Sequence, residues 1–343
     1  IVAASDVYKR QKVINIGVTP GFSAPLFKSL NKFVPDDKTR LKIEIIEIPG
    51  EAWERLAAGD LDMVASPLPE FVIGLARHNP GVIVALTSVS NGNDGILIKD
   101  NVKKITDLTG KKVAVVPGST AHFFLITLLD KEKKSIAELN VAPALYYEDA
   151  LKWFIEDKNV TAAAICQPYL SEGESIGSVV LDSLEKFPPI LCVLVASRNF
   201  IEKQPADLQM VVDSYFKLVS LVRNNPGLAK TLIVTQSGQP IEEVSLLLSS
   251  FKLLSLQEAS DIPAEEVKES IKSIAQVWSI VNLPNADNKI DADGAVNFKF
   301  MKSSAVEPVE LVSELPTTEP TDTTTPELET SENSSSPVVT NSP

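Results

Sequence analysis

The order of apolar and polar residues divides most of the chain into short strands that alternate with helices. In the first series the predicted strands are Val13–Val18, Leu41–Ile48, Leu61–Ser66 and Val82–Val89, and the predicted helices are Pro25–Phe33, Glu51–Ala58 and Glu70–Arg77. Alternation of strands and helices at this interval predicts a mostly parallel sheet that helices cover on both faces.

A second series of the same kind follows. Its predicted strands are Asp94–Lys99, Lys111–Val116, Val141–Tyr147, Thr161–Cys166 and Ile190–Ser197, and its predicted helices are His122–Lys133 and Asp149–Asp157. After Ser197 the apolar residues recur only at three- and four-residue spacing, which predicts helices alone. These helices are Pro205–Arg223, Ala229–Val234, Glu242–Leu254 and Ala264–Val281.

The two series predict an α/β protein of two lobes that are joined by two crossovers. Residues 13–90 would form the first part of lobe one, residues 91–191 lobe two, and residues 192–302 the return to lobe one with the C-terminal helices. We expect the crossovers at Ser90–Asn93 and Ile190–Ser197. Gly92 permits the unusual backbone angles of a hinge, and an ordinary hairpin turn explains the same residues equally well.

The two ends of the chain differ from the rest in composition. Residues 303–343 are rich in Thr, Ser, Pro and Glu and contain neither Lys nor Arg. Such a segment cannot repay the entropy of ordering, so we expect a disordered acidic tail. Residues 1–12 are expected to be a non-native or disordered start, because Ser5–Gln11 resembles a translated adapter fragment. A signal or lipid-anchor segment would then be missing from the sequence.

Composition and charge argue against several classes of protein. The chain has 343 residues, of which 44% are hydrophobic, and it can therefore bury a sizeable core. Its net charge is −13, much of it in the acidic tail, and it has no basic cluster, which argues against nucleic-acid binding. No apolar run is long enough to cross a bilayer.

The scarcity of cysteine and histidine limits the possible chemistry. The only residues of these types are Cys166, Cys192, His78 and His122, and neither HExxH nor CxxC occurs. We therefore expect no metal and no cofactor, and we favour two buried free thiols over a single bridge, which the spacing does not support. No Ser–His–Asp arrangement can be recognised around His122, because no motif surrounds it.

Small, hydroxyl-bearing and amide-bearing residues gather in turns that directly follow predicted strands. Ligands of open parallel sheets bind beyond the carboxyl ends of the strands, so these turns predict a ligand-binding cleft. The turns read TPGFSAP, SPLP, SNGND, PGSTAH and CQPYL. The predicted ligand-binding residues are Gly21, Phe22, Ser23, Ser66, Pro67, Asn91, Asp94, Ser119, Thr120, His122 and Gln167.

The turn Pro117–His122 allows more than one interpretation. A helix start leaves backbone N–H groups unpaired, and either a Ser or Thr side chain or an anionic ligand can satisfy them. His122 could contact the ligand, cap neighbouring carbonyls or pack in the first helical turn. Phe22 and Tyr147 could stack on a ligand ring or pack in the core, and Tyr169 could also cover a ligand.

Several motifs, in their order along the chain, resemble the substrate-binding proteins of nitrate/sulfonate/taurine-type ABC transporters, in the thiamine-pyrimidine-synthase-like periplasmic binding protein superfamily. The motifs are GDLDMV, SNGNDGILIK, ITDLTGKKVAVVPGSTAHFFL, CQPYL and CVLVASRNFIEKQP. The resemblance spans roughly residues 13–300. Its most specific part is DLTGKKVAVVPGSTAH.

The resemblance implies a type II periplasmic-binding-protein fold whose lobes close over a small solute without catalysis. The implied solute is a small organic anion, sulfonate-like or related, or a heterocycle, and the implied partner is an ABC permease with its ATPase. The implied location is periplasmic or extracellular, with membrane association only through the permease or a lost lipoprotein anchor. An enzyme of thiamine-pyrimidine or menaquinone pathways, or a sensor, is the alternative on the same fold.

The sequence departs from the family pattern near Cys166, and this leaves the ligand class open. The family commonly has an acidic or aromatic residue and a Trp there, where this chain reads ICQPYL. No Arg falls in the predicted turns, so a singly charged anion or a neutral heterocycle is favoured over a doubly charged anion.

Overall fold

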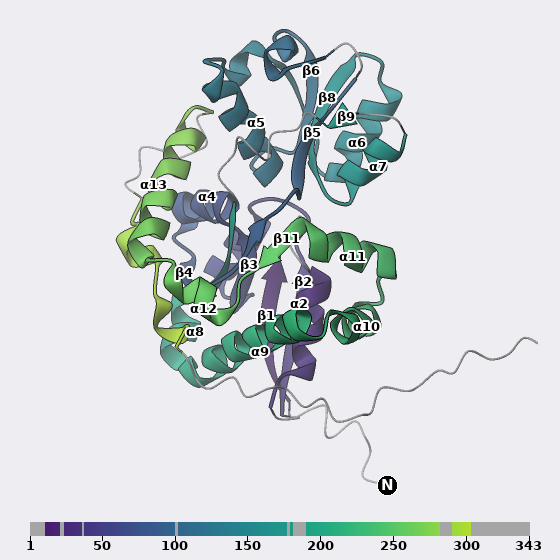
Figure 1. The fold of residues 1–343 in the computed structure, drawn as a ribbon. Helices are drawn as coiled ribbons and strands as arrows, with labels where there is room; N and C mark the ends of the chain where they lie inside the picture. The colour runs from purple at the N-terminus through teal and green to yellow at the C-terminus, as the bar shows by residue number, and fades with distance from the viewer. Residues whose placement is uncertain are drawn as a thin grey trace, which may run out of the picture. The chain divides into compact units, whose positions relative to one another are not determined.

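Two β-sheets, each accompanied by helices, organise the chain (Figure 1). The computed structural model describes residues 11–20, 24–35, 38–99, 102–176, 179–180, 190–281 and 290–302, all of which belong to one unit, residues 1–308. The predicted tail, almost all of the predicted start and the candidate residues Gly21, Phe22 and Ser23 lie outside the described residues.

The first sheet has six strands in the order β11–β4–β10–β3–β1–β2. Their bounds are β1 Lys12–Val18, β2 Thr39–Ile45, β3 Met63–Pro67, β4 Gly81–Ser90, β10 Leu191–Ser197 and β11 Phe251–Leu253. β1 pairs in parallel with β2 and β3, whereas β10 runs antiparallel to both β3 and β4. β1 to β4 therefore share one direction.

The second sheet has five strands in the order β7–β6–β8–β5–β9. Their bounds are β5 Asp94–Ile98, β6 Lys112–Val115, β7 Asn140–Pro143, β8 Val160–Cys166 and β9 Val179–Val180. β6 pairs in parallel with β7 and β8, and β5 is antiparallel to its neighbours β8 and β9. The two predicted sheets are present, but both are mixed, because β10 and β11 in the first sheet and β5 in the second run opposite to the other strands.

Helices accompany both sheets. Those that follow strands of the first sheet or belong to the C-terminal series are α2 Ala24–Lys28, α3 Glu51–Ala58, α4 Leu68–His78, α8 Arg198–Lys203, α9 Pro205–Asn224, α10 Pro226–Ser237, α11 Ile241–Ser250, α12 Leu256–Asp261 and α13 Ala264–Ser279. Those of the second sheet are α5 Thr120–Lys131, α6 Tyr147–Glu156 and α7 Tyr169–Ser175. Short 3-10 turns lie at Ser29–Lys32, Ile105–Leu108, Ile136–Glu138, Asp293–Ala295 and Phe298–Phe300. Within the described residues, no helix is both long and apolar enough to cross a membrane.

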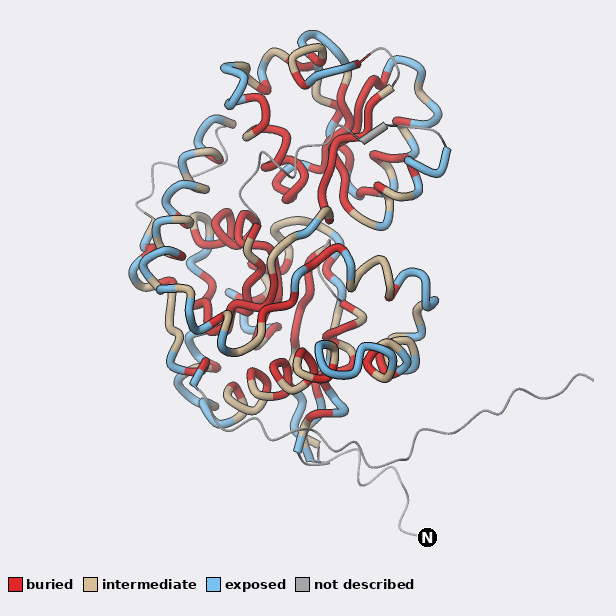
Figure 2. The backbone as a smooth tube through the Cα atoms, in the orientation of Figure 1, coloured by how far each residue is buried: buried red, intermediate tan, exposed pale blue. Residues whose placement is uncertain are grey.

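The core lies in the strands and in the helix faces turned toward them, as the buried residues in Figure 2 show. Every residue of β3, β5 and β8 is buried, which explains why these strands are largely apolar; Ser66, Asp94 and Thr161 are their buried polar residues. α4 is buried from Leu68 to Leu75. Gly74 is needed there because a Cβ atom would meet the Trp53 ring of α3 at 2.3 Å.

The segment between β4 and β5 connects the two sheets, so the hairpin alternative for SNGND is wrong. Gly92 has φ +86°, a value that favours glycine. Asn91 is tied to the C-terminal helices because its backbone N–H and its Nδ2 donate to the carbonyls of Ser250 (2.7 Å) and Ser249 (3.0 Å). The other predicted crossover, Ile190–Ser197, is almost entirely strand β10.

Two predicted elements are wrong. β7 ends at Pro143 and α6 already begins at Tyr147, so the strand predicted over Val141–Tyr147 covers two elements. The helix predicted to reach Leu254 ends at Ser250, and Phe251–Leu253 form β11, which pairs with β4. Pairing with a distant strand overrides the local helical spacing there.

Candidate functional site

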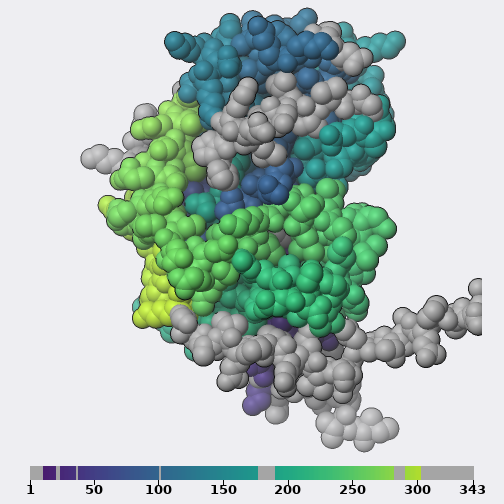
Figure 3. Space-filling view, viewed as in Figure 1, coloured from purple at the N-terminus to yellow at the C-terminus, as the bar shows by residue number. Residues whose placement is uncertain are grey.

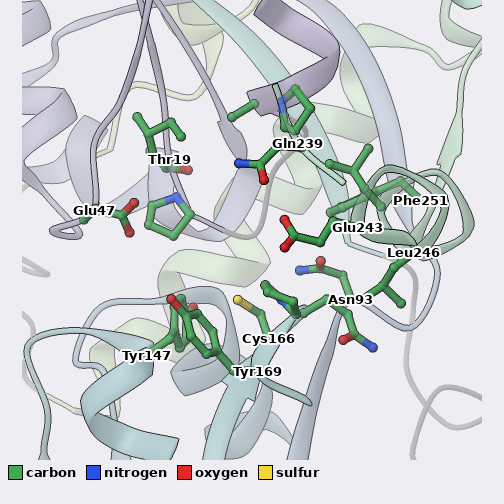
Figure 4. A pocket seen from close by; sticks show the side chains of 17 residues that line it. Thr19, Glu47, Asn93, Tyr147, Cys166, Tyr169, Gln239, Glu243, Leu246 and Phe251 are labelled. Carbon is green, nitrogen blue, oxygen red and sulfur yellow. The ribbon is translucent and has the colours of Figure 1, made fainter. Parts of the chain in front are cut away.

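A cavity of about 230 Å³ lies where residues of both sheets and of the C-terminal helices meet (Figure 4). The first-sheet side contributes Thr19, Pro20, Ala24, Pro25, Ile45 and Glu47. The second-sheet side contributes Asn93, Tyr147, Cys166, Gln167, Pro168 and Tyr169. The segment around α11 contributes Gln239, Glu243, Leu246, Leu247 and Phe251.

The cavity lies beyond the carboxyl ends of parallel strands from both sheets. Thr19 and Pro20 follow β1, Glu47 follows β2, and Cys166 ends β8. This is the place where α/β sheets usually bind ligands, and the strand-end turns in the sequence predict it.

One wall of the cavity is aromatic. The rings of Tyr147 and Tyr169 are stacked, with centroids 6.4 Å apart and an interplanar angle of 29°. Tyr147 is 5% exposed, and its hydroxyl has no hydrogen-bond partner within the described structure. Such a wall could cover a flat or alkyl part of a ligand.

The charged groups of the cavity are carboxylates. Glu47 and Glu243 are its only charged lining residues in the described part of the chain, and no Lys or Arg accompanies them. Partial burial raises the pKa of Glu47. In Figure 4 the Glu243 carboxylate points into the cavity on the side of Asn93, opposite Glu47.

Cys166 brings a thiol to the cavity, and Cys192 lies buried in β10. Both cysteines are free, so the prediction of two buried free thiols is confirmed. Burial raises the pKa of the Cys166 thiol well above its ordinary value. The thiol therefore stays protonated, and a protonated thiol is a poor nucleophile.

A buried carboxylate on α4 already binds the start of α5. One oxygen of Glu70 accepts hydrogen bonds from the backbone N–H (3.3 Å) and the hydroxyl (3.0 Å) of Thr120, and its other oxygen accepts one from the Ser66 hydroxyl (3.4 Å). Thr19 donates to Ser66 at 3.1 Å. The N-terminus of α5 thus holds an anionic side chain of the chain itself.

Burial raises the pKa of two acids in this buried layer, Glu70 and Asp94, to about 7. The hydrogen bonds from Thr120 oppose the rise at Glu70, and the nearby Asp94 adds to it. One Asp94 oxygen accepts a hydrogen bond from Asn93 (3.2 Å), and the other has no partner among the described residues. Neither acid is neutralised by a basic side chain in the described structure.

The other groups at the start of α5 are also paired within the chain. The Ser119 hydroxyl accepts from the backbone N–H of His122 (3.2 Å), and His122 Nδ1 accepts from the Gly118 N–H (3.1 Å). Burial lowers the pKa of His122 to about 4, so the imidazole is neutral. Its ring centroid lies 5.5 Å from that of Trp278 on α13.

The predicted site residues that the structure describes fall into three groups. Gln167 lines the cavity, where its side-chain oxygen also accepts from Ser171 at the start of α7. A second group lies in the buried layer and does not line the cavity; it comprises Ser66, Pro67, Asp94, Ser119, Thr120 and His122. Asn91 is exposed at the crossover. Whether these residues contact a ligand stays a prediction.

Sequence reasoning missed the acidic residues of the cavity and all the contributions around α11. Glu47 lies inside the predicted strand Leu41–Ile48, whereas β2 ends at Ile45, so it does not fall in a turn that follows a predicted strand. Glu243, Leu246 and Phe251 lie far along the chain, and only tertiary packing brings them to the strand ends.

Comparison with known proteins identifies the family of the chain and two relatives with named ligands. Residues 38–229, more than half of the chain, match the family model described as "NMT1/THI5 like". An Escherichia coli (strain K12) protein named for aliphatic sulfonate binding is 23% identical over 242 residues, covering 69% of this chain and 75% of the relative. The taurine-binding periplasmic protein of the same strain is 26% identical over 159 residues, covering 44% of this chain and 47% of the relative.

Solved structures share the fold. The alkanesulfonate-binding protein SsuA from Xanthomonas axonopodis pv. citri, bound to MOPS, has a TM-score of 0.66 at 18% identity, covering 83% of this chain and 98% of SsuA. The desulfurization enzyme DSZB has a TM-score of 0.61 at 14% identity, covering 85% and 98%. The two-lobe fold of periplasmic binding proteins is therefore present, and by its family match the chain belongs to the NMT1/THI5-like family.

Proposed function

We propose that this protein is an extracytoplasmic solute-binding protein that captures a small organic solute in its cavity and delivers it to an ABC importer. The observation that carries the proposal is the origin of the cavity lining, which comes from both sheets and from α11. A solute held by both sheets would stabilise one arrangement of the lobes, and a permease could recognise that arrangement.

Relatives named for sulfonate and taurine binding support this proposal and give the first compounds to test. The name of the taurine relative also supports a periplasmic location. We extend the proposal to a permease and its ATPase as partners, because delivery of a solute across a membrane requires them.

A thermal-shift screen of the full chain tests the proposal. The panel contains taurine, alkanesulfonates, nitrate, phosphonates, pyrimidines and simple amines. A ligand at about a hundred times its Kd stabilises the folded state by about 2.7 kcal/mol and raises the Tm measurably. Tyr169→Ala, which removes one ring of the aromatic wall, should reduce the shift, and Tyr169→Phe should preserve it.

The same samples separate a binding protein from an enzyme on this fold. The compound that raises the Tm is incubated with the protein and then recovered for mass spectrometry. Recovery of the unchanged compound is expected, because burial and the nearby carboxylates keep the Cys166 thiol protonated. Conversion of the compound, or the failure of every compound to raise the Tm, would contradict the proposed function.

A further inference from the structure

Two acidic side chains from separate elements line the cavity. Glu47 comes from the segment after β2, and Glu243 from the first turn of α11. Among the described residues neither carboxylate forms an ion pair, and no basic side chain lines the cavity. Figure 4 shows the two carboxylates on different sides of the same space. A ligand between them would meet negative charge from both.

Buried polar atoms next to the cavity point to a missing partner. The Tyr147 side chain lines the cavity and is 5% exposed, yet its hydroxyl makes no hydrogen bond of good geometry within the described structure and has only loose contacts with the Ser119 hydroxyl and the Cys166 thiol. One oxygen of Asp94, a residue that is 7% exposed, is equally unpaired. Buried polar atoms rarely stay without partners, so unpaired ones beside an open cavity mark a place for ligand groups.

The chemistry of these groups defines what the cavity would recognise. Carboxylates accept hydrogen bonds and attract positive charge, and an anion placed among them would be repelled. The stacked rings of Tyr147 and Tyr169 add an aromatic surface, over which a cationic group is stabilised.

We infer that the solute presents a protonated nitrogen to this cavity, with Glu47 and Glu243 as its charge partners. The inference rests on the proposed function and narrows its substrate class. An aminosulfonate and a simple organic amine both carry such a nitrogen, whereas a plain alkanesulfonate does not.

Three compounds of equal carbon skeleton test the inference: ethanesulfonate, taurine and ethylamine. Their binding to the full chain is measured by thermal shift and titration calorimetry. Taurine or ethylamine, or both, should bind at least about tenfold more tightly than ethanesulfonate, a difference equivalent to about 1.4 kcal/mol. Binding of taurine alone identifies an aminosulfonate, and binding of ethylamine as well identifies an amine site.

Charge-neutral variants complete the test. Glu243→Gln and Glu47→Gln should each weaken binding of the nitrogen compound by about tenfold, because a charged hydrogen-bond acceptor becomes a neutral one. Glu242→Gln is the matched control: it changes the same charge on the neighbouring, exposed residue of α11, which does not line the cavity. All three residues are exposed, so the variants should fold as the wild type does.

The outcomes separate the inference from the proposed function. If ethanesulfonate binds as tightly as taurine and the Gln variants retain its affinity, the inference is overturned while the solute-binding function stands. If none of the three compounds binds but another member of the screening panel without a basic nitrogen does, the inference is again overturned. If nothing in the whole panel binds, both the inference and the proposed function are contradicted.

Discussion

At the scale of a single residue, the Glu70 carboxylate occupies the N-terminus of α5, a position where an anionic ligand could otherwise bind. Its carboxylate lies at the positive end of α5 and accepts the N–H and the hydroxyl of Thr120. The sequence PGSTAH predicts a helix start, which is confirmed, and it leaves open whether a Ser or Thr side chain or a ligand satisfies the free N–H groups; Ser119 is the cap. It does not indicate that a residue 50 positions earlier in the chain fills the anion-binding position.

The buried acids predict how stability changes with pH. The pKa values of Glu70 and Asp94 rise from 4.5 and 3.8 to about 7 on folding, so the folded chain binds more protons than the unfolded chain between these values. Their contribution to the free energy of unfolding therefore falls as pH increases from about 4 to about 7, and it is constant above that range.

Glu70→Gln tests this contribution. The amide can still accept from Thr120 but cannot ionise, so the variant should lose part of the decline in Tm between pH 5 and pH 8 that the wild type shows. Glu156→Gln, at an exposed glutamate of α6, serves as the control and should follow the wild type. An unchanged decline in Glu70→Gln would show that the buried carboxyl does not lower stability on ionisation.

At the scale of an element, the C-terminal helix α13 packs against helices of both sheets. Trp278 is 4% exposed and donates from Nε1 to the carbonyl of Pro69 on α4 (2.9 Å). Its ring also lies against Phe123 of α5, with the centroids 5.4 Å apart. α13 therefore contacts a helix of each sheet, and the C-terminal helices cover much of the face shown in Figure 3.

Substitution of Trp278 measures this connection. Trp278→Ala should lower the free energy of unfolding by about 3–5 kcal/mol, because it leaves a large cavity between helices. Trp278→Phe keeps a ring and loses the hydrogen bond, so a smaller loss of about 1–3 kcal/mol is expected. Urea unfolding measures both values, and equal losses in the two variants would contradict a packing role for the ring.

Helices and strands with a clear local pattern of apolar residues could be predicted from the sequence. A strand that forms only because it pairs with a strand distant in sequence could not. The strand cores and the helices α4, α5, α9 and α13 match the sequence prediction because burial and spacing coincide there. β11 escaped detection because a three-residue strand has too few positions to show alternation, and its pairing partner β4 lies far away in the sequence.

At the scale of the whole described unit, the cavity combines three segments that are distant in sequence. The strand ends of both sheets could be placed from the sequence, since strand–turn–helix order determines where turns gather. The position of α11 beside the cavity, with Glu243 and Leu246, could not be predicted from the sequence, because no local pattern indicates which sheet a C-terminal helix packs against. The sequence therefore predicts a cleft and raises Tyr147 and Tyr169 as residues that could cover a ligand, but it misses the acidic residues of the cavity.

Titration calorimetry on a cavity-filling variant tests most directly whether the solute binds in this cavity. Leu246 lines the cavity and Ile241 is an exposed residue of the same helix, so Leu246→Trp obstructs the cavity and Ile241→Trp is the matched control. With the compound that raises the Tm most, we predict binding of one molecule per chain to the wild type and to Ile241→Trp. Binding should be lost in a folded Leu246→Trp variant. Undiminished binding to Leu246→Trp would contradict the account.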